Sequence, residues 1–153
     1  MKVGIGSDRN GQTYREEIQK YLEALGYETV IFQEQEASDD YPDIAVQVAE
    51  AILNQEITRG VLICGTGIGM AIAANKVPGI RAAVGHDFFS VQRSVLSNNA
   101  QIITFGQQII GEKLMLSYLE EFLKLEFVEG RSTPKLKKIS GYEQEYQEKK
   151  RGR

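Results

Sequence analysis

Five short apolar segments, separated by stretches with helical periodicity, constrain most strongly what this chain can fold into. They span residues 3–6, 27–32, 61–64, 80–84 and 101–105. Strands that alternate with helices are joined by right-handed crossovers, which produce a parallel sheet covered on both faces. The sequence therefore predicts a single α/β domain, a three-layer α/β/α sandwich around a five-stranded, Rossmann-like parallel sheet.

The expected helices lie near 14–25, from 41 onwards, and over 70–75, 88–96 and 111–125. Pro42 and Asp43 suit a first helical turn, where proline fits and a carboxylate meets the positive end of the helix dipole. From about Lys135 the chain is charged and helix-prone, and Gly141 is a candidate interruption of that tail. No repeat or linker divides residues 1–153, which predicts one domain.

Composition excludes several classes of protein. With 42% hydrophobic and 25% charged residues the chain can bury one core, and its net charge of −3 offers no basic field for nucleic acid. No apolar run approaches the roughly 20 residues that a membrane helix needs, and the N-terminus does not resemble a signal peptide. Cys64 is the only cysteine, so no internal disulfide can form. We expect a cytoplasmic protein without nucleic-acid or membrane partners.

The segment from Cys64 to Gly69 is the most informative about function. In a sheet of this kind ligands bind at the carboxyl ends of the strands, and this segment follows a buried-type strand directly. Its three glycines let the backbone approach a ligand, with N–H groups at the helix start to hold an anion. A thiol placed there can serve as a base or nucleophile. The alternatives are a tight turn that needs glycine for geometry alone and a buried structural cysteine.

Charged residues at other strand ends are further candidates. Asp8 follows the first strand, where its carboxylate can bind hydroxyl groups, move a proton or cap the next helix. Arg9, Arg131 and Lys135 are candidates for phosphate contacts, the alternative being solvated surface charge. His86, the only histidine, follows the fourth strand and is either an acid–base group or a solvent-facing loop residue.

Together these features resemble the family of ribose-5-phosphate isomerase B and the galactose-6-phosphate isomerase subunits. The resemblance covers nearly the whole chain. Its most specific segments are 6–8 (GSD), 40–42 (DYP), 63–69 (ICGTGIG), 73–81 (AANKVPGIR), and 98–100 (NNA) leading to Phe105 and Gly106.

The resemblance implies an aldose–ketose isomerase that acts on a small phosphorylated sugar through a cis-enediolate, without metal or organic cofactor. One histidine and one cysteine cannot make a metal site of the usual kinds. In this family the site lies between two subunits, which implies a homodimer or a dimer of dimers. By resemblance, Cys64 is the base, Asp8 contacts the sugar hydroxyls, and the substrate is bound by Tyr41, Gly65, Gly67, Ile68, Gly69, Asn98, Arg131 and Lys135. Thr66 is a further catalytic candidate, and Arg9 and His86 are further candidates for substrate binding that the family pattern does not supply.

Four positions depart from the isomerase B pattern. Arg9, Ser97 and Ser132 stand where that pattern has histidine, and Gln108 stands where it has arginine; the histidine at position 97 is credited with sugar ring opening. Three outcomes are open: His86 substitutes, a related subunit of a hetero-oligomeric galactose-6-phosphate isomerase supplies a histidine, or the substrate needs no ring opening, as with a four-carbon sugar phosphate. A non-catalytic sugar-phosphate-binding relative is the alternative of another class, against which the presence of Cys64 and Asp8 argues.

Overall fold

A five-stranded parallel sheet forms the centre of the protein, as seen in a computed structural model that describes residues 1–36 and 39–152. The strand order is β2-β1-β3-β5-β4. The strands are β1 (Lys2–Ser7), β2 (Glu28–Phe32), β3 (Arg59–Cys64), β4 (Ala82–Val84) and β5 (Ile102–Gly106). The sheet matches the prediction, except that β4 is shorter than the apolar run at 80–84.

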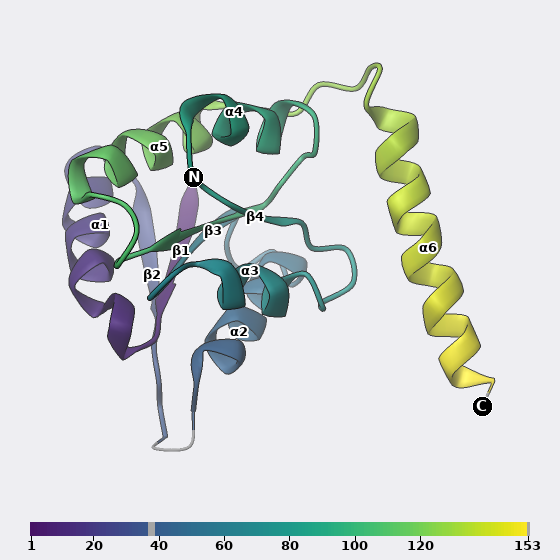
Figure 1. Ribbon diagram of the computed structural model, residues 1–153, viewed down its shortest axis with the longest axis horizontal. Helices are drawn as coiled ribbons and strands as arrows, with labels where there is room; N and C mark the ends of the chain where they lie inside the picture. The colour runs from purple at the N-terminus through teal and green to yellow at the C-terminus, as the bar shows by residue number, and fades with distance from the viewer. Residues whose placement is uncertain (37–38, 153) are drawn as a thin grey trace.

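Five helices cover the two faces of the sheet, and a sixth lies beside it (Figure 1). Helices α1 (Gln12–Ala24), α4 (Phe88–Leu96) and α5 (Glu112–Lys124) lie on one face, while α2 (Tyr41–Leu53) and α3 (Ile68–Ala74) lie on the other. A short 3-10 turn (Arg9–Gly11) leads into α1. The three-layer α/β/α architecture is therefore confirmed.

Alternation of side chains along the buried strands divides the core into two parts. In β3, Val61 and Ile63 pack with α1, α4 and α5, whereas Leu62 and Cys64 pack with α2 and α3. All four side chains are buried, as the apolar run at 61–64 predicts for a central strand with helices on both faces. Cys64 is thus anchored by its own strand at the edge where β3 ends.

Side-chain caps mark where α2 and α4 begin. Asp40 and Asp43 form a reciprocal capping box at the start of α2, next to Pro42, as the sequence predicts for this turn. Asp87 caps α4 by accepting a hydrogen bond from the Ser90 backbone at 2.8 Å.

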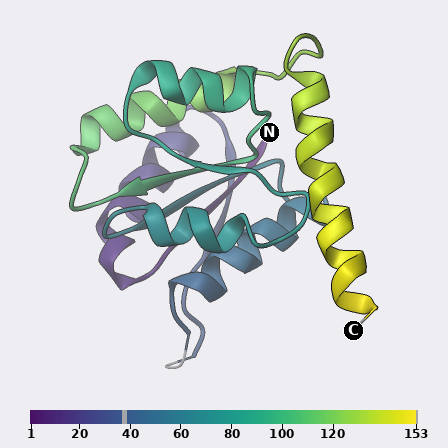
Figure 2. The same cartoon turned by 45° about the vertical axis from the view of Figure 1, so that its right-hand side comes forward.

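Helix α6 (Thr133–Arg151) departs from expectation in two ways. It begins before Lys135, with Pro134 in its first turn, and it runs through Gly141 without a break. One helical glycine costs about 1 kcal/mol relative to alanine, which a run of good helix formers on both sides tolerates. No residue of α6 is buried, and it stands beside the sandwich in both views (Figures 1 and 2). Among the described residues, no helix combines the length and apolarity needed to cross a membrane.

Candidate active site

Cys64 lies at the carboxyl end of β3 with its sulfur inside a tight turn. The side chain is 6% exposed, and the backbone N–H of Gly67 donates a hydrogen bond to its Sγ at 3.1 Å. A donor aimed at the sulfur stabilises negative charge on it. The turn therefore orients the thiol and supports its use as a base.

Gly67 packs against β5 at the point where it donates this hydrogen bond. Gly67 has φ +77°, in the left-handed region, and a Cβ there would lie 2.8 Å from the backbone of Phe105. Buried Thr104 donates its hydroxyl to the Gly67 carbonyl at 2.8 Å. The turn thus packs directly on β5 and requires glycine at this position. The structure thus supports the geometric requirement for glycine, and the same residue donates its N–H to Cys64.

Two more side chains border the turn. A Cβ at Gly69 would lie 2.7 Å from the ring of Tyr41, so the first residue of α2 closes over the first turn of α3. Gln108 donates its backbone N–H to the Gly65 carbonyl at 3.0 Å, and its side chain lies over Gly65. The structure therefore brings Tyr41, the 64–69 segment and Gln108 together at one edge of the sheet.

Asp8 lies at the same edge, on the neighbouring strand. The register pairs Ser7 with Ile63, so Asp8 follows β1 beside the end of β3. Asp8 is 5% exposed and accepts hydrogen bonds from Asn10, from the backbone N–H at 2.9 Å and the amide at 3.3 Å. Asp8 thus caps the 3-10 turn at the same edge of the sheet as Cys64.

A polar cavity of about 250 Å³ opens on the other side of Asp8. It is lined by Arg9, Arg15 and Glu34, and Arg9 Nη2 donates to Glu34 Oε2 at 2.9 Å. The Arg9 side chain is 72% exposed and that of Glu34 only 21%. Hydrogen bonding and attraction by Glu34 raise the pKa of Arg9 above its ordinary value, so this guanidinium stays charged.

Four of the expected substrate-binding residues do not join this site within the protomer. His86 is exposed after β4, which is separated from β3 by β5, about 10 Å across the sheet. Asn98 precedes β5, and because Ile102 pairs with Gly60 while Gly106 pairs with Cys64, the strand separates Asn98 from Cys64 by about 13 Å or more.

Arg131 and Lys135 are also remote from Cys64. Arg131 precedes α6 and Lys135 lies in its first turn, on the side of the molecule away from the 64–69 segment (Figure 1). Both are exposed, and neither forms an ion pair with any residue in 1–36 or 39–152.

Two contributors to this edge are missed by reasoning from sequence. Thr104 carries a weak signal, because it is a hydroxyl residue inside an otherwise apolar strand. Arg15 donates from its Nη1 to the Ser7 hydroxyl at 3.1 Å. Its sequence context gives no signal of this contact, because arginine is an ordinary residue in a surface helix.

Comparison with known proteins links this geometry to a single family. Residues 3–139 match the family model described as Ribose/Galactose Isomerase. The chain is 45% identical to D-erythrulose-4-phosphate isomerase 2 of Mycolicibacterium smegmatis, over 94% of this chain and 97% of that protein. It is 42% identical to D-erythrulose-4-phosphate isomerase of Pectobacterium atrosepticum, over 97% and 98%. Ribose-5-phosphate isomerase B of Clostridium thermocellum superposes with a TM-score of 0.91 at 44% identity, over 95% of this chain and 99% of that chain.

Proposed function

The chain belongs to the ribose/galactose isomerase family, and we propose that within this family it isomerises a four-carbon sugar phosphate at a site shared between two subunits. Its relatives are sugar-phosphate isomerases, so the protein is an aldose–ketose isomerase of a small phosphorylated sugar rather than a non-catalytic relative. The identity of the sugar, the residue roles and the assembly are the parts proposed here.

In the proposed reaction Cys64 moves one proton between two carbons. Its thiolate removes the proton from C2 of the open-chain aldose, and the C–H electrons form the C1–C2 double bond of a cis-enediolate. The electrons of the C1=O bond move onto the C1 oxygen as the enediolate forms. The same proton then returns to C1, while the proton of the C2 hydroxyl passes to the C1 oxygen and the C2 oxygen becomes the ketone. The hydrogen bond from Gly67 to Sγ supports this role, because it holds the sulfur in one orientation.

Other groups at this edge hold the substrate. Backbone N–H groups of the 65–69 segment stabilise the developing oxyanion, since the first N–H groups of a helix have no partner within it. Asp8 and Thr66 bind the sugar hydroxyls, and Tyr41 borders the carbon chain. Arg9 contacts the phosphate after leaving Glu34, and its exposed guanidinium supports that movement.

The absence of a positioned imidazole carries the substrate assignment. Ser97 takes the place of the family's ring-opening histidine, and its hydroxyl accepts a hydrogen bond from Arg93. His86 is exposed and a strand away. A four-carbon aldose 4-phosphate has no free C4 hydroxyl with which to close a five-membered ring, so its isomerisation requires no ring opening. Two relatives named D-erythrulose-4-phosphate isomerase point to the same substrate class.

A shared site explains why expected binding residues lie far from Cys64. In a two-fold dimer, Asn98, Arg131 and the α6 residue Lys135 of one subunit reach the 64–69 segment of the other. Lysine at 135 keeps a charge for the phosphate but cannot bind it in bidentate fashion as arginine does.

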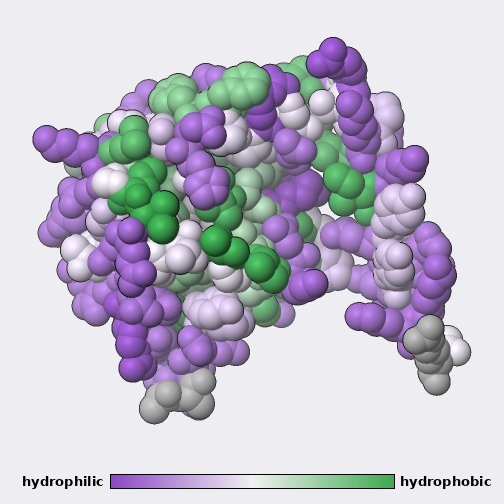
Figure 3. Space-filling view, in the orientation of Figure 1, coloured by the Kyte–Doolittle hydropathy of each residue, from purple (hydrophilic) through white to green (hydrophobic). Residues whose placement is uncertain are grey.

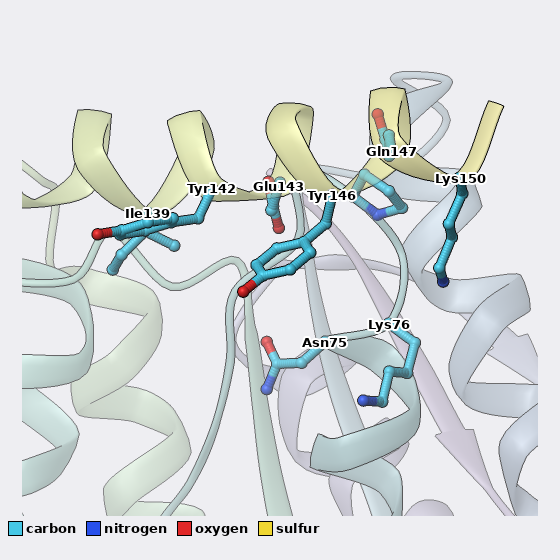
Figure 4. Close-up of a pocket in the computed structure, with 9 residues that line it drawn as sticks. Asn75, Lys76, Ile139, Tyr142, Glu143, Tyr146, Gln147 and Lys150 are labelled. Atoms are coloured by element: carbon cyan, nitrogen blue, oxygen red, sulfur yellow. The ribbon is translucent and has the colours of Figure 1, made fainter. Parts of the chain in front are cut away.

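Exposed apolar residues support a second copy as the partner. Ile68 and Ile72 on α3 are 53% and 56% exposed, and in Figure 3 apolar side chains gather over that helix. On α6, Tyr142 and Tyr146 are more than half exposed and face a cavity of about 400 Å³. In Figure 4 Tyr146 and Glu143 point from α6 towards Asn75 and Lys76. Burying these faces gives the apolar contact that a stable dimer needs.

The substrate assignment is tested by measuring kcat/KM for erythrose 4-phosphate and ribose 5-phosphate in the wild type, Ser97→His and His86→Ala. We expect the wild type to prefer the four-carbon sugar, and Ser97→His to raise the rate on ribose 5-phosphate by at least about 10-fold, since a positioned acid–base group is worth 10²–10⁴-fold. A wild type that prefers ribose 5-phosphate, with His86→Ala unchanged, would overturn the assignment.

The assembly is tested by sedimentation of the purified chain. We expect a homodimer or dimer of dimers with isomerase activity. A stable 17.1 kDa monomer with full activity would exclude the shared site. A chain that is inactive alone and active only with a related subunit would instead support the hetero-oligomer.

A further inference from the structure

Arg81, just before β4, holds the turn that carries Asn98. Its Nε donates to the carbonyl of Asn99 at 2.9 Å, and its Nη1 lies 3.4 Å from the carbonyl of Gly79. Asn99 has φ +47°, in the left-handed region that non-glycine residues seldom adopt. The guanidinium therefore binds the carbonyl of a strained residue directly next to Asn98.

The side chain of Gln101 joins Arg81 to the same turn from the other side. Its Oε1 accepts from the Arg81 backbone N–H at 2.8 Å, and its Nε2 donates to the Gly79 carbonyl at 2.9 Å. Burial lowers the pKa of Arg81 from its ordinary value, and the carboxylate of Glu143 opposes that effect. The guanidinium is thus half buried, charged and committed to backbone carbonyls.

Helix α6 is attached to this cluster through Glu143, whose carboxylate accepts a hydrogen bond from the Gly79 N–H at 3.1 Å. Apart from contacts at its two ends with Gly130 and Gly152, no other residue of α6 receives a hydrogen bond from the rest of the described chain. Arg81, Asn98 and Glu143 also line one cavity, of about 370 Å³, together with Leu136 and Ile139 of α6. The turn before β5 and the helix are therefore fixed relative to each other by one set of contacts.

We propose that Arg81 is a positioning residue: it holds Asn98 and, through Gly79 and Glu143, it holds helix α6 with Lys135 and the preceding Arg131 in the arrangement that completes the neighbouring subunit's site. This inference rests on the proposed shared site. A guanidinium suits the task because its planar fork donates to carbonyls of two chain segments at once, which a lysine cannot do in one geometry. Arg81 contacts no substrate; it acts through the residues that do.

The inference makes a prediction about complementation between subunits. Arg81→Met displaces the residues that its subunit contributes to the neighbouring site (Asn98, Arg131 and Lys135) but leaves its own Cys64 turn intact. A Cys64→Ala subunit lacks the thiol but still contributes these residues correctly. A heterodimer of the two variants therefore contains one complete site and one inactive site. We expect the Arg81→Met homodimer to lose at least about 10-fold in kcat/KM, mainly through KM, and the heterodimer, co-expressed with two tags, to recover about half of the wild-type activity.

Control pairs separate this inference from the proposed function. A heterodimer of Cys64→Ala with Asn98→Ala tests the shared site itself, and failure of that pair to recover activity would overturn the proposed assembly. If that pair recovers but Arg81→Met with Cys64→Ala does not, or if the Arg81→Met homodimer has wild-type kinetics, the positioning role is wrong. Arg81→Lys should recover only part of the lost activity.

A surface variant keeps the test decisive if Arg81→Met does not fold. Glu143→Ala removes the α6 end of the cluster without touching the core. We expect a rise in KM of about 3- to 10-fold that the Cys64→Ala partner also corrects. Glu145→Ala, on the same helix and paired only with exposed Lys149, is the matched control and should keep wild-type kinetics. Unchanged kinetics in Glu143→Ala would contradict the inference.

Discussion

Replacing Gly67 with alanine tests the link between the glycine turn and the thiol of Cys64, the proposed base. The substitution has two physical costs. Alanine at φ +77° is disfavoured by about 1–2 kcal/mol. Its Cβ would also lie 2.8 Å from the carbonyl carbon of Phe105, and because the obstacle is strand backbone, relief requires movement of the turn, a further cost of about 1–3 kcal/mol.

Gly26 offers a matched control for the first cost alone. It has φ +85°, after α1, and no atom lies within 4 Å of its would-be Cβ. Gly26→Ala should therefore lower the free energy of unfolding by about 1–2 kcal/mol and leave activity unchanged. Gly67→Ala should lower it by about 2–5 kcal/mol in total. Urea unfolding at one fixed protein concentration measures both, since the stability of an oligomer depends on concentration.

Activity gives the second measurement on the same variants. Displacing the Gly67 N–H removes the donor to Cys64 Sγ, so we expect kcat of Gly67→Ala to fall by about 10²-fold, as when a preorganised donor is lost. Equal destabilisation in the two variants would refute the clash with β5. Wild-type kcat in Gly67→Ala would show that this hydrogen bond does not serve the reaction.

Three further predictions address the base, the core and a helix cap. Cys64→Ala should lower kcat by about 10²–10⁴-fold and stop exchange of the substrate's C2 proton in D₂O while leaving circular dichroism unchanged; near wild-type turnover would exclude a cysteine base. Arg59 donates to the backbone carbonyls of Phe122 and Leu125 at the end of α5, and its guanidinium lies 4.9 Å from the centroid of the Phe122 ring. Arg59→Met should therefore lower the free energy of unfolding in urea by about 2–4 kcal/mol. A decrease below about 1 kcal/mol would show that water satisfies these carbonyls in place of the guanidinium. Hydrogen bonds from Ser90 lower the pKa of Asp87 in the folded protein. The stability that this carboxylate contributes is therefore fully present when the pH is above the ordinary carboxyl pKa, and it is lost as the pH falls through the lowered pKa. Asp87→Ala should reduce Tm by about 2–4 °C at pH 7, and this difference should shrink below about pH 4; a constant difference would contradict the cap's ionic character.

The sequence alone determined the architecture and which segments meet at the edge of the sheet where the site is proposed. Apolar runs and helical periodicity are local signals, and the crossover rule turns them into one topology without long-range information. The strand rule then placed Asp8 and the 64–69 segment at one edge of the sheet. Pro42 and Asp43 predicted the start of α2 because helix capping is also a local signal, completed within four consecutive residues.

Only the tertiary structure decided how these parts meet. The Gly67 turn, whose N–H faces Cys64 Sγ, packs against β5, and Thr104, 37 residues further along the chain, donates to the Gly67 carbonyl. The separation of Asn98 from Cys64 follows from strand register, and the link from Arg81 to α6 follows from a contact between Gly79 and Glu143. A contact between two segments distant in sequence needs only one suitable side chain in each segment, so it produces no repeating pattern in the sequence. Its geometry is set only when the folded sheet brings the two segments together.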